Sequence, residues 1–137
     1  MSERVEMLSV EDAIETAKEM GIRESMAKVN AYRMLLNNPQ LARGGNELLT
    51  PLLFTNTPID VRLRELIIMR IGWVTGSCYE WTQHWRFAEA VGLPREDVIG
   101  VRDWRHYDGY DAMDRAVLAA VDDTLEHGKI SDAVWRE

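Results

Sequence analysis

The amino-acid sequence predicts an all-α protein. Apolar residues recur at intervals of three and four along most of the chain, which is the spacing of one face of an α-helix. Strand signals are missing, since no alternating β-branched runs are joined by Asn-Gly or similar hairpin turns. Capping residues, glycines and prolines also divide the chain into helix-length segments. We therefore expect helices joined by short connections.

The first two predicted helices lie between an N-cap and a proline. Ser9 is a typical N-cap, and the apolar pattern that follows predicts a helix that ends at Gly21. Residues 23–38 predict one second helix, which stops before Pro39 because a proline disfavours helical geometry in the residue that precedes it.

The central segment contains both a predicted break and a strongly apolar helix. In residues 39–54 the pair Gly44 and Gly45 is expected to interrupt helical structure, so this element is predicted to be irregular. Residues 61–76 then form an apolar run. We expect Pro58 in the first turn of that helix, where its missing N–H costs nothing.

The C-terminal half predicts further capped helices. Ser77 is placed to cap a helix over residues 78–91, and Gly92 is placed to end it in the left-handed conformation. Later helices are predicted over residues 94–104, 111–127 and 132–137.

Length and composition exclude several classes of protein. The chain has 137 residues, 46% of them hydrophobic, which is enough for one domain over residues 1–137 with a core of its own. The net charge is −7, without a basic stripe, so nucleic acid is not an expected partner. No apolar run is long enough to span a membrane, and the acidic N-terminus does not resemble a signal peptide. We interpret the chain as soluble and cytoplasmic.

The sequence GSCYEWTQHW, residues 76–85, concentrates the chemically reactive side chains. Each residue of a helix advances about 100° around the axis, so Ser77, Glu80 and His84 fall within one narrow stripe. A Glu and a His four residues apart can exchange protons. The same spacing also describes a solvated surface pair that contributes only a few tenths of a kcal/mol. Trp81 and Trp85 favour at least partial burial of this helix.

Metal and thiol chemistry are poorly supported by the spacing. His84, Glu80 and Glu65 could contribute to a metal site, but they match no HExxH or similar signature, so we expect no metal. Cys78 is the one cysteine in the chain, which excludes an intrachain disulfide. His106 and His127 are isolated and are interpreted as loop and helix-end residues.

Residues 62–101, RLRELIIMRIGWVTGSCYEWTQHWRFAEAVGLPREDVIGV, resemble the carboxymuconolactone decarboxylase and alkylhydroperoxidase D family. The peroxidase branch of that family carries a glutamate and, twelve residues later, CxxCxxxH. Aligned on His84, the glutamate corresponds to Glu65, and the two cysteines correspond to Ser77 and Glu80. The resemblance is close over these residues and looser over residues 41–125.

The missing cysteines change the chemistry that the resemblance implies. A dithiol mechanism needs an attacking thiolate and a resolving partner, and Cys78 alone, outside both motif positions, cannot supply both. The decarboxylase branch works without cysteines on a lactone acid derived from aromatic breakdown. By resemblance, Glu65, Glu80, His84 and Ser77 are the candidate catalytic residues of a lyase-like acid–base enzyme that needs no cofactor. Candidate substrate contacts are Arg70, Arg86 and Trp81.

The resemblance also implies an architecture. Family members are all-α helical bundles built around a central helical hairpin, and they assemble into trimers or hexamers with sites near subunit interfaces. Members of this layout commonly continue with further apolar helices. The chain is therefore either a natural short form or lacks C-terminal helices, and the sequence leaves both open.

Three functions remain as hypotheses. The first is an acid–base enzyme that decarboxylates, isomerises or hydrolyses a small organic acid or lactone. The second is a non-catalytic helical oligomer or binding module, and the third is an alkylhydroperoxidase or peroxiredoxin-type activity. A closed site that holds Glu80 and His84 beside an arginine favours the first, whereas a filled or flat site favours the second. The substrate itself is not identified by the sequence.

Overall fold

A computed structural model describes residues 4–55 and 57–136. Across these residues the chain forms helices and turns and contains no strand, which confirms the predicted all-α class. Contacts divide the chain into two compact units, Met1–Pro58 and Ile59–Glu137, and each unit has a hydrophobic core of its own. The single domain over residues 1–137 stays a prediction.

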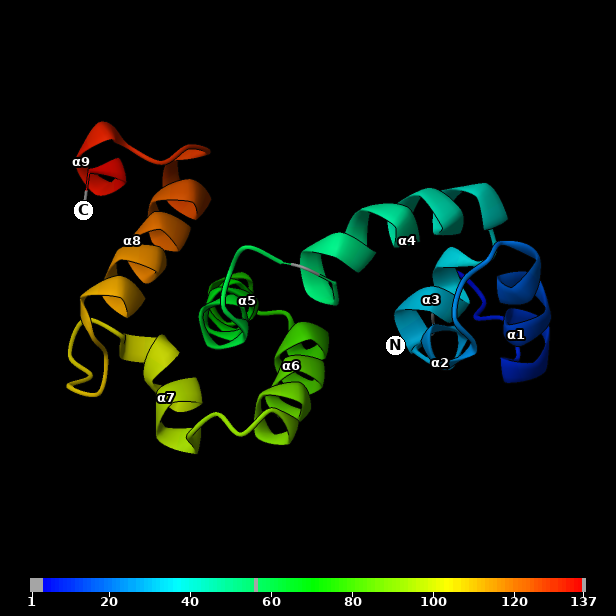
Figure 1. Ribbon diagram of the computed structural model, residues 1–137, viewed down its shortest axis with the longest axis horizontal. Coiled ribbons are helices and arrows are strands. Elements are labelled where there is room, and N and C mark those ends of the chain that lie inside the picture. The colour runs from blue at the N-terminus through cyan, green and yellow to red at the C-terminus, as the bar shows by residue number, and fades with distance from the viewer. Residues whose placement is uncertain (1–3, 56, 137) are drawn as a thin grey trace. The chain divides into compact units, whose positions relative to one another are not determined.

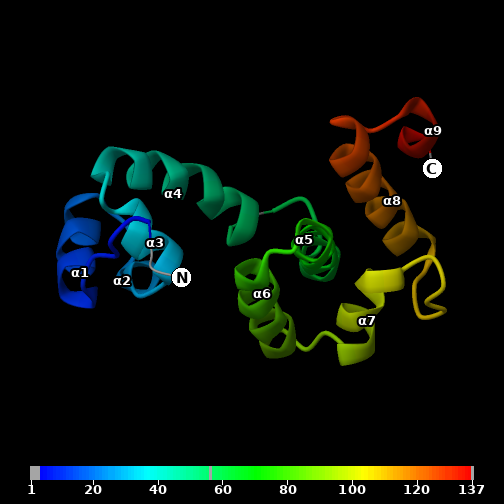
Figure 2. The ribbon, with the colours of Figure 1, turned by 180° about the vertical axis from the view of Figure 1, so that it is seen from behind.

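The described part of the first unit, residues 4–55 and 57–58, contains α1 (Val10–Glu19), α2 (Glu24–Ala27), α3 (Asn30–Leu35) and α4 (Pro39–Leu53) (Figure 2). As predicted, Ser9 caps the first of them, because its hydroxyl oxygen accepts the backbone N–H of Asp12 at 3.0 Å. The core of this unit contains small and large apolar side chains, namely Ala13, Ala17, Ile22, Ala27, Tyr32, Leu36 and Ala42.

The predicted second helix is wrong as a single element. Residues 23–38 contain two short helices, because Val29 adopts an extended conformation between them. Ala27 before the break and Tyr32 after it are both buried in the core of the first unit. Burial on both sides of the bend therefore outweighs the continuous helical pattern that the sequence indicates.

The predicted break at Gly44 and Gly45 is also wrong. α4 runs without interruption from Pro39 to Leu53. Asn38 caps it by accepting the N–H of Leu41, and Pro39 occupies the first turn, where a proline fits. Each glycine in a helix interior costs about 1 kcal/mol relative to alanine. The N-cap and the first-turn proline of α4 help to offset that cost.

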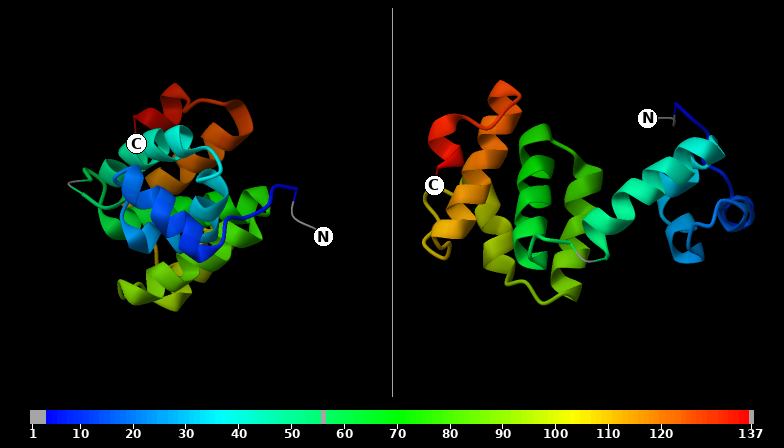
Figure 3. Two further views of the ribbon diagram at one scale, coloured as in Figure 1. Left: turned by 90° about the vertical axis from the view of Figure 1, so that its right-hand side faces the viewer. Right: turned by 45° about the horizontal axis from the view of Figure 1, so that its top comes forward.

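The second unit contains the remaining elements: α5 (Val61–Thr75), α6 (Cys78–Ala90), α7 (Arg95–Gly100), the 3-10 turn η1 (Val101–Asp103), α8 (Ala112–His127) and α9 (Asp132–Trp135). α5 lies between α6 and α8, with α7 beside them (Figure 1), and the right-hand view of Figure 3 shows the same order from another direction. α5 is thus the central helix of this unit.

Capping explains the ends of these helices. Asp60 accepts the N–H of Arg62 and caps α5, so Pro58 lies outside the helix and not in its first turn as predicted. Gly76 takes the left-handed conformation that ends α5, and Ser77 caps α6 as expected. α5 and α6 therefore form a helical hairpin with a two-residue connection. The left-handed conformation predicted at Gly92 is also confirmed, and Gly128 and Ser131 cap the end of α8 and the start of α9.

The hairpin is closely packed at Gly72. A methyl group added there would lie 3.4 Å from both the Glu80 Cβ and the Trp81 backbone nitrogen. The small residue lets the backbone of α6 approach α5 and brings the polar side chains of the two helices within reach of each other. The core behind the hairpin is built from Leu66, Met69, Ala88, Leu93, Val98, Val101, Trp104, Tyr110 and Leu118.

Across residues 4–55 and 57–136, none of the helices combines the length and the apolar character needed to cross a membrane.

Candidate functional site

Glu65 is the buried centre of the candidate site. It lies on α5, and its side chain is only 1% exposed. Its two carboxylate oxygens have different partners: Arg64 Nε donates to Oε1 at 3.0 Å, and His84 Nδ1 lies 2.7 Å from Oε2. Burying a carboxylate is costly unless donors compensate for the lost water, and here two donors do so.

His84 connects this buried carboxylate to the surface. Its side chain is 21% exposed, and its second ring nitrogen, Nε2, lies 3.6 Å from Oε2 of Glu80. That distance is too long for a hydrogen bond, but it is close enough for an ion pair when the imidazole is protonated. Glu80, whose side chain is 45% exposed, reaches solvent. Exposure thus increases from Glu65 through His84 to Glu80.

The contacts determine how the histidine can use its two nitrogens. An ionised carboxylate only accepts hydrogen bonds, so the Glu65 contact places a proton on Nδ1 of His84. In the neutral ring, Nε2 then carries the lone pair and faces Glu80. In the protonated ring, Nε2 carries a proton that it can donate. The arrangement therefore allows Nε2 of His84 to act as a general acid or as a general base.

Ser77 lies at the start of α6, next to this stripe. Its hydroxyl oxygen accepts the backbone N–H of Glu80 at 3.3 Å. This contact makes Ser77 an N-cap and leaves the hydroxyl proton for another acceptor. The catalytic role of Ser77 stays a prediction.

Trp81 belongs to a cluster of rings beside the site. Its ring centroid lies 5.7 Å from that of Trp73 and 6.1 Å from that of Trp85. The guanidinium carbon of Arg102 lies over Trp73 at 4.8 Å and over Trp81 at 4.9 Å, which is cation–π distance. Trp81 therefore packs within unit 2 and also borders the His84 stripe.

The two candidate arginines have different surroundings. Arg70 contacts Asp122 through two hydrogen bonds, 2.6 Å and 3.0 Å long, and also donates to the backbone carbonyl of Val101. Burial alone would raise the pKa of Asp122, but hydrogen bonds from Arg70 and the Trp104 indole outweigh it and lower that pKa. Arg70 is thus directed toward α8 and η1. Arg86 is exposed on α6.

The thiol and the isolated histidines lie outside the site. Cys78 is exposed at the first position of α6. His106 pairs with Asp103, and His127 lies 3.7 Å from Asp123, both at the surface. Within the described residues, no group of three or more His, Cys, Asp or Glu side chains is arranged to hold a metal ion.

Sequence reasoning missed Arg64. This arginine is buried beside Glu65, and its guanidinium carbon lies 5.5 Å from the ring centroid of Phe87 on α6. One signal was present: Arg64 shares a helix face with Ile68 and Ile71, and a charge in an apolar stripe usually has a buried partner. No comparable sequence signal indicates that Arg102 lies over Trp73.

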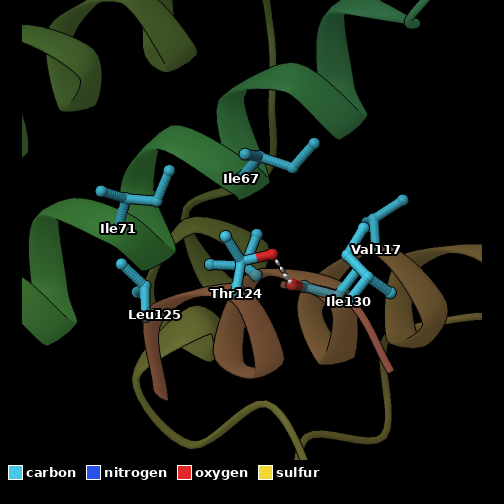
Figure 4. Close-up of a pocket in the computed structure, with 8 residues that line it drawn as sticks. Ile67, Ile71, Val117, Thr124, Leu125 and Ile130 are labelled. Atoms are coloured by element: carbon cyan, nitrogen blue, oxygen red, sulfur yellow. Dashed lines mark hydrogen bonds between the residues drawn. The ribbon is translucent and has the colours of Figure 1, made fainter. Parts of the chain in front are cut away.

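An apolar pocket of about 300 Å³ lies elsewhere in the second unit, between α5 and α8 (Figure 4). Its residues come from α5, α8 and the segment before α9: Ile67, Ile71, Val117, Ala120, Val121, Thr124, Leu125 and Ile130. The Thr124 hydroxyl donates to the carbonyl of Ala120, so it adds little polarity to the lining. This pocket shares no residue with the Glu65 and His84 pair.

Comparison with known proteins identifies the larger part of the chain. A family model described as "Carboxymuconolactone decarboxylase family" matches residues 39–123. The matched range starts at the first residue of α4, ends within α8 and includes Glu65, Glu80 and His84. Searches of curated proteins and of solved structures give no significant match.

Proposed function

The chain belongs to the carboxymuconolactone decarboxylase family, and we propose that it is a cofactor-free acid–base enzyme acting on a small organic acid or lactone. The observation that carries the proposal is the 2.7 Å contact between Glu65 and His84 Nδ1, because it orients a partly exposed imidazole from a buried carboxylate. Pairs of this kind position a histidine for proton transfer in other enzymes.

In the proposed decarboxylation, the bond between the substrate carboxylate and its neighbouring carbon breaks and carbon dioxide leaves. The bonding electrons remain on the substrate as a dienolate, and the proton on Nε2 of His84 is transferred to carbon. Glu80 or water then returns a proton to Nε2, which closes the cycle without any redox change. An isomerisation or a hydrolysis would use the same nitrogen first as a base.

The proposed substrate contacts on α6 are Arg86 and Trp81, although Arg86, two residues after His84, lies about 200° around the helix from it. Arg86 offers a cation for a carboxylate, and Trp81 offers an apolar ring wall. A contact from Arg70 would require its bonds to Asp122 to open, so its proposed part is tested separately. Arg70→Lys should raise KM if the residue binds substrate, and it should only lower thermal stability if it does not.

A second candidate is a non-catalytic oligomer or binding module. The apolar pocket between α5 and α8 favours it, because that pocket carries little polarity and lies apart from His84. The third candidate, a hydroperoxidase, needs a thiol pair that a single cysteine does not provide.

The proposal is tested with carboxymuconolactone and a panel of small lactone acids, by following substrate absorbance and released carbon dioxide. The wild-type protein should turn over at least one of them, and His84→Gln should not. His106→Gln is the matched control, because that histidine is 82% exposed and pairs with a surface aspartate. Equal turnover in wild type and His84→Gln would refute the acid–base proposal.

We further propose that the chain assembles into a trimer or hexamer. The open apolar pocket between α5 and α8 supports assembly of this acidic protein. Several exposed large apolar side chains, Trp73 and Trp135 among them, support it as well. Light scattering should give a multiple of 15.8 kDa at micromolar concentration, and a stable monomer would contradict the proposal.

A further inference from the structure

We propose that Arg64 is a positioning residue for His84 and acts through Glu65. The inference rests on the proposed function, because it assigns the residue that keeps the catalytic imidazole in its working tautomer. In this proposal Arg64 acts on neither ring nitrogen of His84 directly. It contacts the carboxylate that holds one of them.

The two carboxylate oxygens of Glu65 contact different residues. Oε1 accepts from Arg64 Nε at 3.0 Å, and Oε2 lies 2.7 Å from His84 Nδ1. The arginine is held on its other side by the ring of Phe87, at 5.5 Å from the guanidinium carbon. Phe87 comes one helical turn after His84, and their ring centroids are 6.4 Å apart. Arg64, Glu65, His84 and Phe87 therefore pack as one group between α5 and α6.

The permanent charge of arginine gives this contact its effect. A carboxylate that is 1% exposed has little water to stabilise its charge, so it depends on nearby donors. Arginine stays protonated at all accessible pH values, so its stabilisation does not vanish as the solution is titrated. Arg64 thus stabilises the ionised carboxylate that faces Nδ1, and Nε2 is the nitrogen that faces Glu80.

A second arginine on the same helix shows that this arrangement is specific. Arg62 also pairs with carboxylates on neighbouring helices, Asp97 and Asp114, but no histidine contacts those carboxylates among the described residues. Arg62→Gln should therefore lower stability without changing the tautomer of His84. It is the matched control for losing a partly buried arginine from α5.

The first experiment is independent of any substrate. Nitrogen-15 NMR of the imidazole distinguishes the two neutral tautomers. Wild type and Arg62→Gln should show a proton on Nδ1 of His84 and none on Nε2, whereas folded Arg64→Gln should shift toward the opposite tautomer. Arg64→Lys keeps the charge and should restore most of the wild-type signal. A proton on Nε2 alone in the neutral wild-type ring would overturn the inference without any variant.

The second experiment uses turnover of carboxymuconolactone, or of the panel acid that wild type accepts. Arg64→Gln should lower kcat about 10–100-fold with little change in KM, because a misplaced group loses rate more than binding. Its profile of turnover against pH should also move, whereas a purely structural role would leave that profile in place.

The variants separate two kinds of failure. If His84→Gln keeps wild-type turnover, the proposed function fails. If His84→Gln is inactive while folded Arg64→Gln keeps both the wild-type tautomer and the wild-type kcat, only the assignment of Arg64 fails.

Discussion

Two clusters of charged side chains include residues of the central helix α5, and they differ in how their buried carboxylates are stabilised. The closed cluster consists of Arg62, Asp97, Tyr107, Tyr110 and Asp114. The open cluster consists of Arg64, Glu65, Glu80 and His84. Both contain an arginine and carboxylates, and they join α5 to neighbouring helices through Arg62 in the first cluster and Glu65 in the second. They differ in the exposure of their outermost carboxylate, which is 11% for Asp97 and 45% for Glu80.

In the closed cluster the carboxylates are surrounded by donors. Arg62 contacts Asp114, and it donates to Asp97 at 2.8 Å. The hydrogen bond to Asp114, which is 2% exposed, raises the pKa of Arg62. Tyr107 donates to the other Asp97 oxygen, and Tyr110 donates to the Asp97 backbone carbonyl. Such a cluster holds α5, α7 and α8 together, and each carboxylate oxygen of Asp97 and Asp114 already accepts from a donor.

In the open cluster the network ends in partial exposure. The imidazole of His84 is fixed on its buried side by Glu65, while its other nitrogen faces a half-exposed glutamate. Charge that is satisfied on all sides stabilises the fold, whereas charge satisfied on one side remains able to move a proton. The comparison therefore predicts effects on stability in the first cluster and effects on rate in the second.

The largest expected effect is on rate in the open cluster. His84→Gln and Glu80→Gln should each lower kcat by about 10²–10⁴, the usual range for loss of a positioned acid or base. The double variant should be little worse than either single one, because the two groups act on the same proton. Glu65→Gln should act more weakly, as an orienting change. Steady-state kinetics on the accepted substrate measures all four.

Stability is the control for these variants. The pair of Glu80 and His84 is partly solvated, so breaking it should change the free energy of unfolding by no more than about 0.5 kcal/mol. Near-wild-type turnover in both single variants would show that the pair is only a surface contact.

The next effect is on stability in the closed cluster. Asp114→Asn removes the charge that Arg62 contacts and weakens the N-cap pairing with Asp111. We expect a loss of about 1.5–3 kcal/mol, the range for hydrogen bonds to charged groups, measured by urea unfolding. Asp103→Asn is the exposed control and should change stability by less than about 0.5 kcal/mol. A similar loss in both variants would mean that the cluster adds nothing specific.

The sequence predicted the open cluster better than the closed one for a physical reason. Glu80 and His84 lie on one helix, so their meeting follows from its period, and the resemblance added Glu65. The closed cluster joins Arg62 to Asp114, and the chain folds back over several helices before it brings them together. Pairing between residues so far apart in the sequence depends on tertiary packing, and helix periodicity does not predict it.

The same distinction explains the errors in the first unit. Caps such as Ser9 and Ser77 act locally and were predicted correctly. The bend at Val29 was missed because it depends on tertiary packing. Ala27 and Tyr32, on either side of it, are both buried in the core of the first unit. Whether Gly44 and Gly45 break a helix also depends on the surrounding structure, and here they do not.

A smaller effect should appear at alkaline pH. The hydrogen bond to Asp97, then burial, raises the pKa of Tyr107 to about 12. Since the ordinary value is about 10, this stabilisation is complete below pH ~10 and is lost as the pH rises toward 12. Unfolding midpoints should therefore fall over this window. Tyr107→Phe should remove part of that slope, and an unchanged slope would show that the contact does not contribute.

The smallest expected effect is at Cys78, which belongs to neither cluster. The thiol is exposed at the start of α6, and the positions of the two motif cysteines hold Ser77 and Glu80. Turnover of a hydroperoxide by a dithiol mechanism needs a thiolate and a second thiol to resolve it, so one cysteine should give no sustained reaction. Cys78→Ser should therefore leave kcat on the acid or lactone substrate within about twofold of wild type, since a surface substitution changes stability by only about 0.5 kcal/mol. Peroxide consumption is measured alongside, with wild type and Cys78→Ser at equal concentration. Steady consumption by wild type that disappears in the variant would show that a thiol, and not the open cluster, carries the chemistry of this protein.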